Sequence, residues 1–148
     1  MAATANSIIT PQTPYAVNAN LAAITACTTR GPTANGSLAA ANVIALVPVT
    51  TNGVRIDRIY VKAASTSFTA PTAAQTVTIW ISDGTNAYPF DEILVTVVTP
   101  STTVASFQGF NNYTGLVLPA TWSMWVSTSI TTTASTTALV VTATGAAL

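Results

Sequence analysis

Apolar and polar residues alternate along most of the chain, a period of two that is typical of half-buried β-strands. In residues 75–82, for example, Val77, Ile79 and Ile81 share one face, and threonine, tryptophan and serine share the other. No stretch shows a sustained apolar period of 3.6 residues, so we expect no helix. The alternation predicts strands at residues 16–28, 42–50, 54–63, 75–82, 88–98, 103–110, 121–130 and 136–144, with a brief one at 116–118.

Three dipeptides of Asn or Asp followed by Gly separate these segments, at residues 35–36, 52–53 and 83–84. Such dipeptides tolerate the positive φ of tight turns. The strongest hairpin prediction joins 42–50 to 54–63 through the second of them. Pro48 indicates an edge position or a bulge, because proline has no amide proton to donate.

The number and spacing of the strands, with a turn about every ten residues, are typical of a sandwich. A length of 148 residues fits one domain. We therefore predict an all-β, single-domain antiparallel β-sandwich/jelly roll at residues 15–148, after an extended N-terminal arm at residues 1–14. Prolines fix φ in this arm and remove amide donors. Its candidate contacts with a neighbouring subunit are Ile8, Ile9, Pro11 and Pro14.

Residues 54–63 break the alternation. The valine and isoleucine of the first half occupy one face, whereas Ile59 and Val61 occupy the other. A phase slip at Asp57-Arg58 fits a β-bulge. Burial of the strand on both faces is the alternative.

The same strand holds half of the charged residues of the chain: Arg55, Asp57, Arg58 and Lys62. This cluster has two compatible interpretations. It is a contact patch for acidic groups of a partner, or a charged sheet edge that blocks unwanted strand pairing. Arg55, Arg58 and Lys62 are candidate interface residues.

Composition excludes several classes of function. Four basic residues balance four acidic ones, so the chain has no basic face for a nucleic acid. The longest apolar runs, such as residues 43–49, are far shorter than the roughly 20 residues that span a bilayer. Residues 1–14 carry no basic residue and no long apolar run, so we expect no secretory signal there. With 29 Thr and 11 Ser but so few charges, the surface resists association poorly, which indicates an oligomer or a larger particle.

Catalytic and metal-binding chemistry finds little support. Cys27 is the single cysteine and there is no histidine, so we expect no disulfide, no metal site built on nitrogen or sulfur, and no cofactor. Asp83 begins a turn with several oxygens, but a plain hairpin turn is favoured over a cation site. Asp91 and Glu92 are adjacent in a predicted strand and therefore point to opposite faces, away from a common substrate. We expect no enzyme activity.

The tryptophans suggest an interaction surface. Trp80 and Trp125 lie among hydroxyl residues on the face of each strand opposite the aliphatic one. We expect both to point outward into a subunit interface. A second hydrophobic layer within the sandwich and a platform for stacking sugars are the alternatives. Trp122, which shares a face with Val126, is expected in the core.

Three stretches carry a resemblance to a known family. They read NSIITPQTP at residues 6–14, TNGVRIDRIYVKA at residues 51–63, and IWISDGTN at residues 79–86 followed by FDEI. In these stretches the chain resembles small virion proteins of tailed bacteriophages, of the capsid-decoration (cement, head-stabilisation) type.

The resemblance implies a homotrimer on the outer surface of the virion head, made in the host cytoplasm, that bridges neighbouring subunits of the major capsid protein. It implies no catalytic residue, and residues 1–14 correspond to the bridging arm. Two further hypotheses remain from the residues. One is a tail or fibre module that recognises host glycans through Trp80 or Trp125. The other is a glycoside-active enzyme that uses Asp91 or Glu92.

Overall fold

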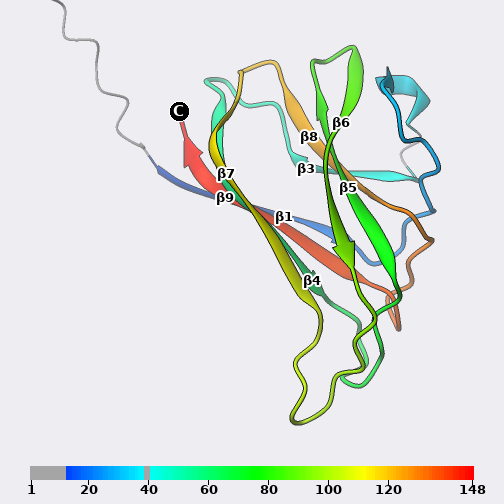
Figure 1. Cartoon of the computed structure of the whole chain (residues 1–148). Coiled ribbons are helices and arrows are strands. Elements are labelled where there is room, and N and C mark those ends of the chain that lie inside the picture. The colour runs from blue at the N-terminus through cyan, green and yellow to red at the C-terminus, as the bar shows by residue number, and fades with distance from the viewer. Residues whose placement is uncertain (1–12, 39–40) are drawn as a thin grey trace, which may run out of the picture.

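The computed structural model describes residues 13–38 and 41–148, which form two antiparallel β-sheets packed face to face (Figure 1). This confirms the predicted all-β sandwich. The four-stranded sheet has the order β1 (Thr13–Leu21), β9 (Leu139–Ala147), β4 (Val54–Ala63) and β7 (Gln108–Leu118). The five-stranded sheet has the order β2 (Thr33–Ala34), β6 (Asn86–Val95), β5 (Gln75–Ser82), β8 (Ser123–Thr128) and β3 (Val43–Val47). A short 3₁₀ turn, η1 (Asn35–Ser37), follows β2.

The main hydrophobic core lies between the two sheets. Alternate residues of each strand point into it, as the period of two predicts. Val77 and Ile79 of β5 belong to the same buried cluster as Ile59 and Val61 of β4, and all four are fully buried. Each such side chain stabilises the fold by about 1.5–3 kcal/mol relative to an exposed one.

A β-bulge on β4 brings the apolar residues of both halves of that strand to the same face. The register of β4 with β7 and with β9 shifts between Ile56 and Arg58. As a result Val54 and Ile56 point inward together with Ile59 and Val61. The bulge predicted at Asp57-Arg58 is confirmed, and the alternative of burial on both faces is wrong.

Gly145 of β9 pairs with Ile56 at this bulge. A Cβ atom at Gly145 would overlap the carbonyl oxygen of Arg55 and lie 2.8 Å from its carbonyl carbon and 3.0 Å from Cα of Ile56. The two backbones therefore approach more closely than any side chain permits. Only glycine allows β9 to follow β4 past the bulge.

The predicted hairpin between residues 42–50 and 54–63 is wrong. β3 belongs to the five-stranded sheet and pairs with β8, whereas β4 belongs to the four-stranded sheet and pairs with β7 and β9. Gly53, with φ of 88°, turns the chain from one sheet to the other. Local turn residues determine where the chain reverses, but the sheet that each strand joins depends on long-range packing. Pro48 directly follows β3, which is an edge strand, as expected.

Among the other strand boundaries that differ from the prediction, those of β1 and β7 matter most. β1 begins at Thr13, so Pro14 lies in an edge strand and not in the arm; an edge position tolerates proline. β1 also ends at Leu21, and the following residues are not a strand. The two strands predicted at residues 103–110 and 116–118 are one strand, β7, which continues through Gly115 with φ of 75°.

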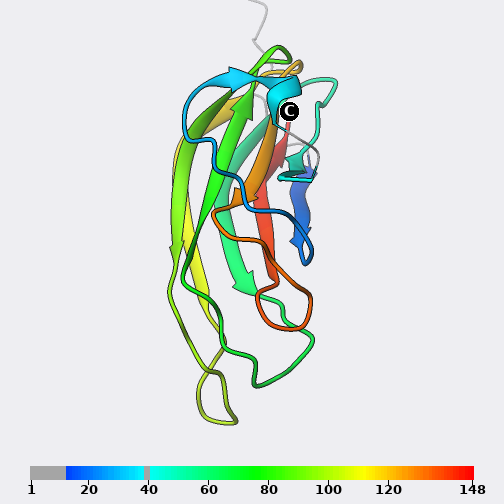
Figure 2. The same ribbon diagram turned by 90° about the vertical axis from the view of Figure 1, so that its right-hand side faces the viewer.

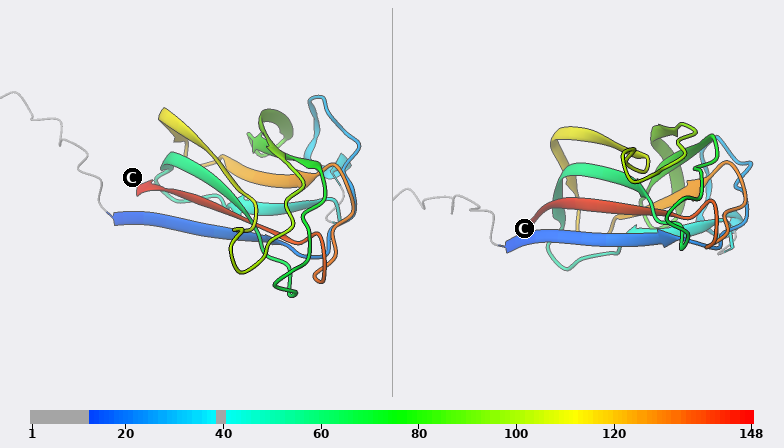
Figure 3. Two further views of the ribbon diagram at one scale, coloured as in Figure 1. Left: turned by 60° about the horizontal axis from the view of Figure 1, so that its bottom comes forward. Right: turned by 90° about the horizontal axis from the view of Figure 1, so that it is seen from below.

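The two sheets differ in what covers their outer faces. Figure 2 shows the segment that follows β1, drawn in blue, crossing the outer face of the five-stranded sheet. Cys27 and Leu38 from this region of the chain pack against Trp80 and Ala87 in a second, smaller core. The four strands β7, β4, β9 and β1 lie side by side in Figure 3. Their outward side chains are exposed on the edge strands β1 and β7 and mostly half-buried on β4 and β9.

Candidate interaction surface

The outer face of the four-stranded sheet gathers polar and aromatic side chains from all four strands. We call it the open face. The sheet register aligns the side chains of β4 with those of its two neighbours, β9 and β7. Its principal residues are Asn18 of β1, Thr142 and Thr144 of β9, Arg55, Asp57, Arg58, Tyr60 and Lys62 of β4, and Phe110, Asn112 and Val117 of β7.

The bulge on β4 explains why so many polar side chains share the open face. A regular strand would place Asp57 and Arg58 on opposite faces, because successive residues alternate. The extra residue at the bulge allows both to point away from the core, where Ile56 and Ile59 are fully buried. The same irregularity that completes the core therefore builds the open face.

Hydrogen bonds hold the side chains of the open face in place. Nε of Arg58 donates to Oδ1 of Asn112 at 2.7 Å, and the Arg58 guanidinium lies 4.9 Å from the centre of the Phe110 ring. The Tyr60 hydroxyl donates to Oε1 of Gln108 at 2.8 Å. Because such cross-strand pairs already order the side chains, less side-chain entropy is lost when a partner binds.

On the β1 side of the same face, the Thr142 hydroxyl donates to Oδ1 of Asn18 at 2.6 Å. Phe110 keeps 52% of its surface exposed and Val117 keeps 48%. An exposed aromatic ring stacked with a guanidinium is typical of interaction surfaces, where Arg and aromatic residues are enriched.

The charges of the open face do not cancel. Arg55 forms a bidentate ion pair with Asp57, with Nε–Oδ1 and Nη2–Oδ2 distances of 2.8 and 3.0 Å. The hydrogen bonds and charge of Asp57 raise the pKa of Arg55. Arg58 and Lys62 have no carboxylate within ion-pair distance in the described part of the chain. The open face therefore has a local charge of +2 within a neutral protein.

The structure thus brings Arg55, Arg58 and Lys62 together, with Pro14 on the same face of β1, paired with Ala146. The interpretation of the charges as a protected sheet edge is wrong, because β4 is an interior strand between β9 and β7. The interpretation as a contact patch remains a prediction. Ile8, Ile9 and Pro11 lie outside the described residues.

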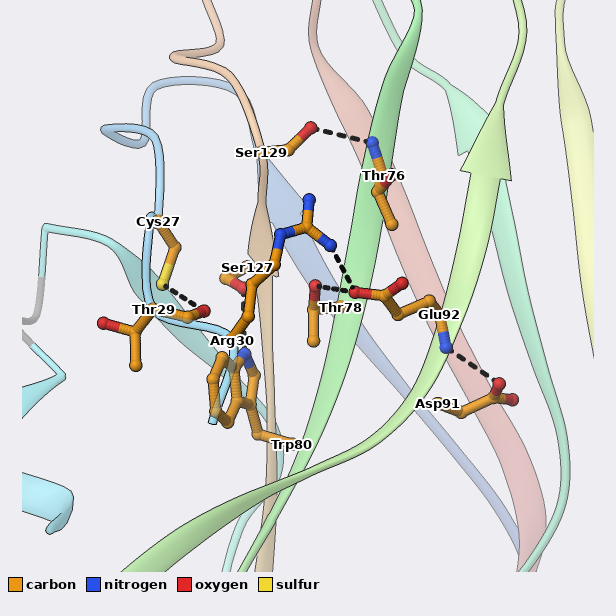
Figure 4. Close-up of polar contacts among 10 residues, drawn as sticks. All are labelled: Cys27, Thr29, Arg30, Thr76, Thr78, Trp80, Asp91, Glu92, Ser127 and Ser129. Atoms are coloured by element: carbon orange, nitrogen blue, oxygen red, sulfur yellow. Dashed lines mark hydrogen bonds and ion pairs between the residues drawn. The ribbon is translucent and has the colours of Figure 1, made fainter. Parts of the chain in front are cut away.

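Trp80 does not form an exposed surface, and that expectation is wrong. It lies on the outer side of the five-stranded sheet, but the chain segment around Cys27 and Leu38 covers it completely, leaving 0% exposed. Figure 4 shows its indole nitrogen beside Ser127, to whose hydroxyl it donates at 2.8 Å. A covered tryptophan cannot contact a partner or stack on a sugar. The alternative of a second hydrophobic layer is correct for this residue.

Trp125 pairs with Trp80 across β8 and β5 and packs against the same small core, but remains half-buried. Trp122 is likewise half-buried and packs against the main core, in agreement with the prediction. The sequence pattern placed Trp80 and Trp125 on the correct side of their strands. It did not reveal the loop that covers that side.

Asp91 and Glu92 point to different partners, as predicted from their adjacency. Glu92 accepts hydrogen bonds from Arg30 at 2.9 Å and Thr78 at 3.2 Å, over the outer side of β5 (Figure 4). Asp91 instead accepts from Asn111 at 2.7 Å and from Tyr113 at 2.6 Å, both on β7. It therefore links the edges of the two sheets.

The flank between β6 and β7 is held by this Asp91 link and by an aromatic pair, Phe90 and Tyr113, whose ring centres are 5.6 Å apart. Burial, followed by the hydrogen bond and the charge of Asp91, raises the pKa of Tyr113 well above its ordinary value. Tyr113 is thus a neutral donor. The arrangement joins the sheets and places no second carboxylate beside Asp91.

Asp83 caps the turn between β5 and β6. Its Oδ1 accepts from the backbone amides of Thr85 at 2.8 Å and Asn86 at 2.7 Å, and these hydrogen bonds lower its pKa. This is the hairpin turn favoured from the sequence. In residues 13–38 and 41–148, no three His, Cys, Asp or Glu side chains are grouped as metal ligands would be.

The most informative residues that the sequence did not single out are Phe110 and Asn112. Between residues 111 and 119 only a brief strand, at residues 116–118, is predicted, whereas in the structure Phe110, Asn112 and Thr114 alternate on one continuous strand. Apolar and polar residues do not alternate regularly there, because Asn111 and Asn112 are consecutive polar residues and glycines stand at positions 109 and 115. The sequence therefore carries no periodic signal for this strand.

No helix among the described residues is long and apolar enough to cross a membrane. Comparison of the chain with protein-family models, with curated proteins and with solved structures gives no match.

Proposed function

We propose that the chain is a structural virion protein of the capsid-decoration type, which binds the outer head surface of a tailed phage and stabilises contacts between major capsid subunits. The observation that carries this proposal is the open face: one sheet surface with ordered aromatic and amide side chains and two cations without carboxylate partners. The resemblance of residues 6–14, 51–63 and 79–86 to such proteins supplies the identity of the partner.

The chemistry of the open face suits a protein surface as its partner. Tyr60 and Arg58 are of residue types that contribute most to binding energy in interfaces. Phe110 is of an aromatic type that is enriched at interfaces. Asn112 and Asn18 offer amide groups for hydrogen bonds at the rim.

Arg58 and Lys62 specify the charge of the partner. These two side chains supply the local charge of +2 on the open face, so the complementary capsid surface would present carboxylates. Such a pairing steers the encounter of the two proteins and weakens as salt is added.

Trimerisation belongs to the same proposal. Three copies around one axis would present three open faces to neighbouring capsid subunits, and each face would strengthen the binding of the others. The part of the proposed arm that precedes β1, residues 1–12, would then contact a neighbouring subunit. Light scattering that finds a stable monomer at micromolar concentration would contradict the trimer.

A co-sedimentation experiment with undecorated phage heads tests the docking surface. We expect wild-type protein to pellet with the heads, and Lys62→Glu to bind several-fold more weakly with a reduced salt dependence. Arg30→Glu is the matched control, because it makes the same charge change at an exposed position over the five-stranded sheet. Absence of wild-type binding contradicts the function. Equal binding of the two variants contradicts the open face as the docking surface.

A further inference from the structure

A groove of about 410 Å³ lies at one end of the sandwich, between the β4–β5 connection and the β6–β7 connection. Figures 1 and 2 show these two loops, in green and yellow-green, projecting together beyond the strands. The volume is within the range of about 300–1,000 Å³ that is usual for small-molecule sites. The groove is separate from the open face, whose residues do not line it.

The lining of the groove is rich in hydroxyl groups and contains no charged side chain. Ser65 and Ser67 line one wall, and the run from Ser101 to Thr103, together with Ser106, lines the other. Ser67, Thr102 and Ser106 have no side-chain hydrogen bond in the described structure, so their hydroxyls are available to a ligand. Hydroxyls both donate and accept, which matches a ligand that does the same.

Hydrogen bonds order both walls of the groove. Oγ of Ser65 donates to the carbonyl of Ser135 at 2.9 Å, and the Thr66 amide donates to the carbonyl of Ala134 at 2.9 Å, which ties the first wall to a third loop. On the second wall, Oγ of Ser101 accepts from the amides of Thr103 and Val104, both at 3.2 Å. A ligand would therefore meet walls that are already arranged.

Phe68 is the exposed aromatic residue of the groove. It lines one wall and keeps 70% of its surface exposed, the highest value among the large exposed apolar residues of the described chain. Val104, 48% exposed, lies on the opposite wall. A ring left in water beside free hydroxyls offers a stacking surface together with polar contacts.

We propose that this groove binds a neutral saccharide. The electron-rich face of Phe68 attracts the C–H face of a pyranose ring, and the serine and threonine hydroxyls bind the sugar hydroxyls. The absence of charge from the lining disfavours sialylated, sulfated or phosphorylated ligands, whose charge would lose water without gaining a partner. This inference does not depend on the capsid role, because it concerns a different surface.

A printed array of neutral and sialylated oligosaccharides tests the proposal, with calorimetric titration of the strongest neutral binder. We expect binding to neutral glycans, weakened about tenfold or more by Phe68→Ala, as for the loss of an anchoring side chain. Phe110→Ala is the matched control: it removes an exposed ring of the open face, 52% exposed, and leaves the groove intact. Both variants change exposed side chains, and thermal unfolding verifies that both are folded.

Four outcomes would overturn the inference. The first is an absence of binding to any neutral glycan on the array, and the second is preferential binding to sialylated glycans. The third is equal glycan binding by Phe68→Ala and Phe110→Ala. The fourth is concentration-dependent self-association that Phe68→Ala abolishes, since a second copy of the chain would then occupy the groove.

Discussion

Replacing Gly145 by alanine tests whether the bulge on β4 organises both the core and the open face. The added methyl group would meet the backbone of Arg55 and Ile56, at 2.8 Å from one carbonyl carbon and 3.0 Å from one Cα. Backbone atoms in the middle of a sheet cannot rotate away as a flexible side chain does. β9 must therefore separate from β4 at this point, and the ladder hydrogen bonds around the bulge must lengthen.

The size of this steric overlap sets the expected loss of stability in Gly145→Ala. Inserting a methyl group into a packed region costs about 1–3 kcal/mol, and contact with backbone places this site at the upper end. For a domain of this size 1 kcal/mol lowers the melting temperature by about 2–4 °C. We therefore expect Gly145→Ala to lower it by roughly 6–12 °C, as measured by circular dichroism.

Gly31→Ala is the matched control for this experiment. Nothing lies within 4 Å of a Cβ atom at Gly31, and its φ is not positive. We expect a change of less than about 1 kcal/mol, through the entropy of the unfolded chain. A melting temperature of Gly145→Ala equal to that of Gly31→Ala would refute the argument that the close approach of β4 and β9 requires glycine.

Two further predictions concern buried polar groups. Trp80→Phe removes the donor to the buried Ser127 hydroxyl and should lower the free energy of unfolding by about 1–3 kcal/mol in urea titration; half-buried Trp125→Phe should cost less, and the reverse order would contradict the covered layer. The raised pKa of Tyr113 means that the folded state holds this proton more tightly than the unfolded state, whose phenol titrates near 10.0. The contribution of Tyr113 to stability is therefore complete below pH 10 and is lost as the pH rises above 10, so Tyr113→Phe should flatten the decline of the urea midpoint between pH 10 and about 12. An unchanged slope would contradict this assignment.

The fold class was predictable because it depends on local alternation. β4 and β5 have the bounds that their apolar periodicity predicts, and the phase slip at Asp57-Arg58 revealed the bulge. Each of these features is a property of consecutive residues. The pattern of consecutive residues does not show which distant strand a given strand pairs with, and therefore β3 was assigned to the wrong partner strand.

The candidate surface was predictable only in part, because it too depends on the pairing of strands that are distant in the sequence. Three cations on one strand were visible in the sequence, but the ring of Phe110 and the amide of Asn112 reach Arg58 through the pairing of β7 with β4. For Trp80 the side of the strand was predicted correctly, but its exposure was not. The loop containing Cys27, which buries Trp80, comes from a distant part of the chain.

The position of β9 determines when the open face can exist during synthesis. This strand, Leu139–Ala147, lies between β1 and β4, so the four-stranded sheet lacks an interior member until residue 147 has been made. β1 must wait for a partner from the other end of the described chain, and such distant pairing is slow. A chain that stops before Leu139 leaves β1 unpaired and divides the surface in two. Incomplete products of translation would therefore be unable to enter an assembly that recognises this surface.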